Sequence, residues 1–270
     1  KMAMHHADWA ITEAGFGFDL GAEKFFDIKC RIADIDPDVV VLVTTVRALK
    51  MHGGNHQDNL VAQDLEAVRR GLANLDKHIE SVALFNKHAV VALNRFTTDT
   101  DAEINLIRQR CIELGVSFAE TRHHAEGGKG AIELAKVVMA AVDKSKAFIP
   151  LYQLEESVLE KVRVVSRAMY GADDVAFSKQ AAKDLKNVEQ LGLTHLPICI
   201  AKAPSSLSDD PLLHGRPRDF EVTVSSIQIN AGAGFLVILT GNIMRMPGLP
   251  KHPSANNIEL LDNGVITGLE

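Results

Sequence analysis

The sequence has few cysteines and no hydrophobic run long enough to cross a bilayer. Its three cysteines, Cys30, Cys111 and Cys199, lie far apart in apolar surroundings and show no metal-ligand spacing. We therefore expect reduced, buried thiols, with neither a disulfide framework nor a metal site. The longest apolar runs, such as 39–43, are far too short for a membrane span. With no signal peptide visible, we expect a cytoplasmic protein that contacts no membrane.

The sequence also lacks an excess of positive charge. The formal net charge is -6 at pH 7, and the isoelectric point is about 6.0. Nucleic-acid binding draws much of its affinity from basic side chains that displace counterions, so we expect no nucleic-acid partner. A local basic pocket for an anionic substrate stays compatible with this balance.

Common catalytic motifs are absent from these 270 residues. There is no G-x-x-x-x-G-K-[S/T] phosphate loop, and there is no G-x-S-x-G, C-x-x-C, H-E-x-x-H or kinase-type set. Taken residue by residue, the sequence predicts only an α/β ligand-binding unit with a pocket near Asn94 and His124.

Hydrophobic periodicity predicts alternating strands and helices over residues 1–148. Runs of β-branched and aliphatic residues predict strands, whereas apolar residues at three- and four-residue spacing predict helices. Strands that alternate with helices imply a mostly parallel sheet with flanking helices, so the predicted fold class is α/β. We expect strands at 9–12, 39–45, 88–94 and 116–119, and helices at 61–82, 101–114 and 132–142.

Residues 149–270 are expected to form a smaller α+β domain. A helix over 158–169 should end at Gly171, and Ser178 should cap a second helix that ends near Gly192. Three further apolar stretches predict strands at 196–201, 220–229 and 234–240.

Two short segments near the predicted strands could contact anions. Gly15 and Gly17 lie in a glycine-rich loop whose backbone N–H groups could approach a phosphate, although the spacing does not match the dinucleotide fingerprint. A tight structural turn is the stronger interpretation of this loop. Arg47 and Lys50 precede a Gly-Gly pair and could bind a carboxylate or phosphate, or could simply face solvent.

Two loops at predicted strand ends are the best candidates for a ligand pocket, since ligands of open α/β sheets bind beyond the carboxyl ends of strands. In the first loop, Asn94 could bind a purine edge and Phe96 could stack on a ring, unless Thr98 or Asp99 caps the next helix and Phe96 is core. The second loop, 123–130, leads into a helix and offers an anion site. An imidazole that faces a pocket is favoured there over a metal ligand.

Several segments together resemble formate–tetrahydrofolate ligases. The matching segments occur in the order typical of that family and cover essentially the whole chain: 12–31, 43–54, 94–100, 170–173 and 246–250. The sequence departs from the family pattern at three places. Thr44 replaces the usual Ala, His124 stands where Trp is common, and Ala203-Pro204 replaces Thr-Gln.

The resemblance implies an enzyme of one-carbon metabolism whose main domain is similar to P-loop NTPases. Such enzymes use ATP with Mg²⁺ to convert formate into formyl phosphate, and then transfer the formyl group to N10 of tetrahydrofolate. A monovalent cation is a further cofactor that the resemblance suggests. In-line phosphoryl transfer depends on positioning and cations, which accounts for the metal and for basic residues.

The resemblance also assigns residues to the substrates. Phe96 matches an aromatic that stacks on the pterin, and His124 matches the opposite wall of that sandwich. Gly127 and Gly128 match the loop beside the stacking position. Asn94 and Arg95 fall near the nucleotide, whereas no catalytic residue is assigned.

By this resemblance, the chain corresponds to the C-terminal half of a bacterial-type enzyme. The expected partners are the N-terminal half of the same protein, which would carry the phosphate loop, and further copies in a homotetramer. Without that loop, we expect the 270 residues alone to be inactive. The alternative hypothesis is a non-catalytic relative that binds folate or nucleotide.

Overall fold

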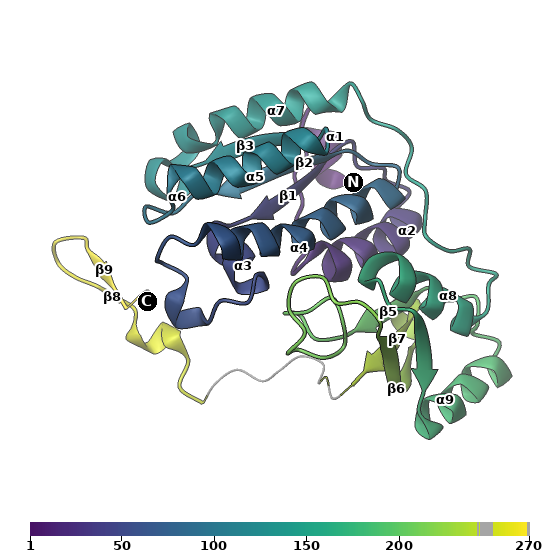
Figure 1. Ribbon diagram of the computed structural model, residues 1–270. Helices are drawn as coiled ribbons and strands as arrows, with labels where there is room; N and C mark the ends of the chain where they lie inside the picture. The colour runs from purple at the N-terminus through teal and green to yellow at the C-terminus, as the bar shows by residue number, and fades with distance from the viewer. Residues whose placement is uncertain (242, 244–250, 269–270) are drawn as a thin grey trace.

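A computed structural model describes residues 1–241, 243 and 251–268 (Figure 1). The fold is α/β, as the sequence predicts, and contains two larger sheets and one small hairpin. The segment 246–250, which carries part of the family resemblance, lies outside the described residues. Among the described residues, no helix is both long enough and apolar enough to cross a membrane.

The first sheet consists of three parallel strands in the order β1-β2-β3. The central strand, β2, is the most buried, because helices and both neighbouring strands surround it. The bounds are β1 (Val40–Thr44), β2 (Ala89–Asn94), β3 (Ser117–Thr121), α3 (Val46–His52), α4 (Leu65–Leu84), α5 (Asp101–Glu113), α6 (His123–Glu126) and α7 (Ile132–Val142). The three expected strands over 39–121 and the expected helices are confirmed, although α4 begins at Leu65 because Asp64 caps it.

Glycine allows α3 and α4 to approach closely. A Cβ atom at Gly71 of α4 would lie 1.9 Å from the carbonyl oxygen of Leu49, and one at Gly53 would lie 1.9 Å from the carbonyl oxygen of Ala67. These backbone contacts fix the position of α3, which begins directly after β1 at the carboxyl edge of the sheet.

The expected strand at 9–12 is wrong. After the short helix α1 (Met2–His6), these residues pair with no described strand, and Ile11 is 97% exposed. The chain then enters a mostly π-helical segment that the sequence analysis did not anticipate. It consists of η1 (Phe18–Ala22), η2 (Phe25–Cys30) and α2 (Arg31–Ala33).

The second sheet has the order β4-β6-β7-β5, with β6 and β7 antiparallel and the outer strands parallel to their neighbours. Gly171 ends the first helical stretch with a φ of 80°, and Ser178 caps the next helix, as predicted. Three strands were missed: β4, and the strands β8 and β9, which form the small hairpin. The bounds are α8 (Val158–Val165), η5 (Ser166–Tyr170), β4 (Asp174–Phe177), α9 (Lys179–Gln190), β5 (Ile198–Ala201), β6 (Glu221–Asn230), β7 (Phe235–Thr240), β8 (Glu259–Leu260) and β9 (Ile266–Thr267). Short helical turns complete the described chain: η3 (Gln57–Asn59), η4 (Gly127–Ala131), η6 (Ala231–Ala233) and η7 (Ser254–Asn257).

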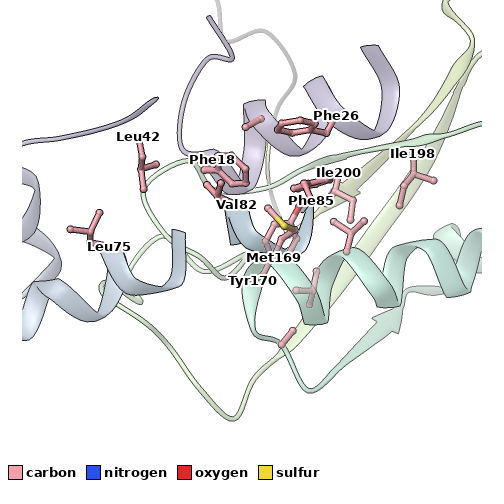
Figure 2. Packing of buried hydrophobic residues seen from close by; sticks show 14 of the residues in the cluster. Phe18, Phe26, Leu42, Leu75, Val82, Phe85, Met169, Tyr170, Ile198 and Ile200 are labelled. Carbon is pink, nitrogen blue, oxygen red and sulfur yellow. The ribbon is translucent and has the colours of Figure 1, made fainter. Parts of the chain in front are cut away.

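One cluster of buried hydrophobic residues extends from the first sheet to the second (Figure 2). Phe26 of η2 stacks on Phe85, which follows α4, with ring centroids 4.6 Å apart. Met169 and Ile200 from the second half of the chain belong to the same cluster. Domains at 1–148 and 149–270 remain our proposal, and this shared core would join them.

Candidate functional site

The candidate site lies at the carboxyl edge of the three-stranded sheet. Because the strands are parallel, the segments that follow them emerge at the same edge. Thr45 caps α3 by accepting a hydrogen bond from the Ala48 N–H at 3.0 Å. The loop after β2 is held to β3 by the Arg95 N–H, which donates to the Thr121 carbonyl at 3.0 Å. The three strand-end segments therefore converge.

Phe96 is held at this edge in a half-buried position. Its N–H donates to the buried carboxylate of Asp99 at 2.8 Å, and the Arg47 guanidinium lies 4.4 Å from its ring centroid. Arg47 also donates to Thr98 Oγ1 at 3.3 Å. Thr100, and neither Thr98 nor Asp99, caps α5. Phe96 is half-buried and lies outside the buried core cluster, so the alternative that places it in the core is wrong.

His124 lies in the short helix α6, which follows β3, and its side chain is exposed. Gly127 has φ 58° and ψ -142°, a conformation that suits only glycine. Gly130 lies so close to Arg122 that a Cβ would meet the Arg122 carbonyl carbon at 2.5 Å. In the described part of the chain, no ring contact joins Phe96 and His124, so their role as a pair of walls stays a prediction.

Asn94 and Arg95 have different surroundings. Asn94 Oδ1 is buried and accepts no hydrogen bond from the described residues. Such an acceptor costs about 1–3 kcal/mol if it stays unpaired. Arg95 is already bound to two carboxylates, Glu120 at 3.0 Å and Asp101 at 2.9 Å. Asn94 is therefore the better candidate for a direct ligand contact.

The structure corrects the assignment of Lys50 as a candidate anion contact. Its side chain is only 1% exposed, and its ammonium forms an ion pair with Glu103 at 2.6 Å. It also donates to the carbonyl oxygens of Ala62 at 2.7 Å and Leu60 at 3.2 Å. Because the Glu103 carboxylate and the two carbonyl oxygens occupy its three donors, Lys50 has no donor left for a ligand anion, and it does not face solvent. Its contacts join α3 to the segment before α4 and to α5.

The glycine-rich loop of residues 15–21 is packed as a tight turn. A Cβ at Gly21 would lie 1.8 Å from the carbonyl oxygen of Gly15, and one at Gly17 would lie 2.4 Å from Asp19 Oδ1. The Asp19 carboxylate, paired with Lys202 at 2.7 Å, disfavours a phosphate at Gly17. We therefore leave Gly15 and Gly17 out of the site.

A pocket lies along β3, and its lining includes Glu126, Lys129 and Gly130 of the segment 123–130, where the sequence analysis placed an anion site. It has a volume of about 390 Å³, and its lining includes Arg108, Glu120, Arg122 and Lys129. The sequence analysis did not anticipate the part of the lining on α5 and β3, such as Arg108 and Glu120, for which the sequence signal is the density of charged residues around β3. A family model described as formate–tetrahydrofolate ligase matches residues 1–270, and therefore spans both sheets and all three strand-end segments.

Proposed function

The chain belongs to the formate–tetrahydrofolate ligase family, and from this premise we propose that the edge at Phe96 binds tetrahydrofolate. The family uses formate, tetrahydrofolate and ATP. The observation that carries the proposal is an aromatic ring held at the carboxyl edge of a parallel sheet, with Arg47 covering one side. The pterin stacks on the other side of Phe96.

The neighbouring loops complete the folate site in this proposal. His124 forms the opposite wall, and its exposure leaves the imidazole free to turn toward the pterin. Gly127 and Gly128 have no atom within 4 Å of a Cβ position, so the ligand can approach their backbone. Asn94 and Arg95 form the nucleotide side, where the unpaired Asn94 Oδ1 accepts a hydrogen bond from the base.

The reaction that we propose has two steps. A formate oxygen attacks the γ-phosphorus of ATP, which releases ADP and gives formyl phosphate. The N10 amine then attacks the formyl carbon, phosphate leaves, and N10 loses its proton. Activation is needed because hydroxide is a poor leaving group, whereas phosphate is a good one.

We propose that this chain supplies the folate side of the reaction. Residues 1–270 contain no phosphate loop, so the part of the enzyme that grips the triphosphate would come from other polypeptide. In the described residues, no three His, Cys, Asp or Glu side chains gather in a metal-binding arrangement.

Two assays test the proposal. Tetrahydrofolate should bind the 270-residue chain, and the chain alone should form no 10-formyltetrahydrofolate from ATP and formate. A longer polypeptide that also contains a phosphate loop should form it. Turnover by the chain alone would contradict the proposal that the triphosphate is bound by other polypeptide. Absence of folate binding would contradict the proposed folate site. Binding without turnover in the longer protein would instead support a non-catalytic relative.

A further inference from the structure

The proposed reaction releases a proton that needs an acceptor at the site. When N10 attacks the formyl carbon, the nitrogen gains a positive charge, and it becomes neutral only when it loses its hydrogen. A positioned general base that removes such a proton accelerates the step by about 10²–10⁴-fold. One methylene group separates N10 from the pterin, so a base that serves N10 belongs at the carboxyl edge that holds Phe96.

His123 leaves the sheet at the same edge as Phe96. Asn94 of β2 lies opposite Thr121 of β3 in the parallel pair, and Phe96 and His123 each follow two positions later. The Arg95 N–H donates to the Thr121 carbonyl at 3.0 Å, which holds the two segments together where they leave the sheet. Figure 1 shows α6, which begins at His123, at one end of the sheet. The backbone of His123 therefore starts beside the segment that carries Phe96, and its side chain is exposed.

Thr121 holds the His123 ring and assigns its tautomer. The buried Thr121 Oγ1 donates its single proton to the Leu93 carbonyl at 3.3 Å. The same oxygen lies 3.2 Å from His123 Nδ1, so it accepts a hydrogen bond from Nδ1–H. With the proton on Nδ1, the neutral imidazole keeps a lone pair on Nε2. No described residue forms a hydrogen bond with Nε2, which is therefore free to accept a proton.

Other titratable groups at this edge are less suited to this role. Asp99 is buried, and its carboxylate accepts the Phe96 N–H at 2.8 Å. Burial alone would raise the pKa of Glu120, but hydrogen bonds from two arginine side chains outweigh burial and lower it, which makes Glu120 a weaker base. The His124 ring forms no hydrogen bond with the described residues, so nothing orients it as Thr121 orients the ring of His123.

Resting on the proposed function, we propose that His123 is the general base that accepts the N10 proton during formyl transfer. The N10 lone pair forms the new bond to the formyl carbon, and the C–O bond to phosphate breaks with its electron pair leaving on phosphate. The electron pair of the N10–H bond stays on nitrogen, while the proton moves to Nε2 of His123. Because His123 is exposed, the imidazolium then returns this proton to water. Thr121 is a positioning residue in this step, since it holds the ring through Nδ1.

Single-turnover formyl transfer by the longer polypeptide that carries the phosphate loop tests this role. His123→Ala should slow the transfer by about 100-fold, within the range of general-base catalysis. The Kd for tetrahydrofolate should stay within about threefold, because at most one neutral hydrogen bond is lost. Imidazole added to the His123→Ala protein should restore the rate in proportion to its concentration, since the side chain it replaces is open to solvent. Thr121→Val removes the acceptor of Nδ1–H and should slow the transfer less than His123→Ala does.

His195→Ala is the matched control. His195 is also exposed, and its Nδ1–H donates to the Gly192 carbonyl at 3.0 Å, so this ring is the same tautomer in the second half of the chain. The variant should transfer the formyl group at the wild-type rate, with or without imidazole.

Two results would overturn the general base and leave the folate site intact. The first is a wild-type transfer rate in His123→Ala, or a slow rate that imidazole does not restore. The second comes from nitrogen NMR of the wild-type 270-residue protein, in which the neutral His123 ring should carry its proton on Nδ1; a proton on Nε2 would contradict the assignment. Absence of transfer by the wild-type longer polypeptide would instead contradict the proposed function.

Discussion

Replacing Lys50 by methionine should strongly destabilise the protein and leave the tetrahydrofolate affinity of the folded protein unchanged. Methionine keeps the length of the side chain and removes its charge. The substitution leaves the carboxylate of Glu103 buried without its cation at 2.6 Å, and leaves the carbonyl oxygens of Leu60 and Ala62 without a donor. Breaking one side of a buried ion pair costs about 3–5 kcal/mol.

Thermal unfolding followed by circular dichroism measures this loss. At 2–4 °C for each kcal/mol, a value typical of domains near this size, the midpoint should fall by about 10 °C. Arg47→Met is the control, since it removes the same charge from the same helix at a half-buried position. It should cost about 1 kcal/mol at most in stability, but it should weaken folate binding by releasing Phe96. If Lys50→Met left the unfolding midpoint unchanged and weakened folate binding, the reasoning would be refuted, and Lys50 would be a ligand-binding residue.

Three further substitutions probe other parts of the structure. Asp27→Asn tests a buried acid. Burial, and then the charge of Glu23, raise the pKa of Asp27 to about 8 from its ordinary 3.8. The stability of the wild-type protein should therefore fall as pH rises from about 4 to 8. The stability advantage of the variant in urea unfolding should grow over that window, and a shrinking advantage would contradict the assigned sign. Gly71→Ala would place a Cβ 1.9 Å from the Leu49 carbonyl oxygen, and should lower the free energy of unfolding by about 3 kcal/mol in the same assay. Gly232→Ala is the control, since open space surrounds it, and should change the free energy of unfolding little. His124→Trp should bind tetrahydrofolate about fivefold more tightly, because indole adds about 1 kcal/mol of stacking, and equal or weaker binding would show that His124 is no pterin wall.

Local signals in the sequence were sufficient for much of the fold. The helix at Ile132–Val142 follows from its apolar spacing, and Gly171 and Ser178 mark helix ends because their conformations and side chains suit those positions. The parallel sheet follows from alternating strands and helices, and this topology alone brings Asn94 and the segment that contains His124 to one edge.

Features that depend on distant partners could not be predicted in the same way. A lysine such as Lys50 is expected at the surface from its sequence alone, and only tertiary packing brings Glu103 to it. Residues 9–12 have strand-like composition, but no described strand lies beside them to pair. The shape of the pocket at Lys129 likewise depends on the packing of α5 and α7 against β3, and the hydrophobic periodicity of the sequence does not determine that packing.

The central claim is that Phe96 forms the stacking surface for the pterin, and the affinity of Phe96→Ala for tetrahydrofolate tests it most directly. Loss of the ring should raise the Kd about tenfold or more, since a buried aromatic contact contributes area burial plus about 0.5–1.5 kcal/mol of stacking. The melting midpoint should change little, because Phe96 lies outside the buried core. A folded Phe96→Ala protein with the Kd of the wild type would contradict the claim.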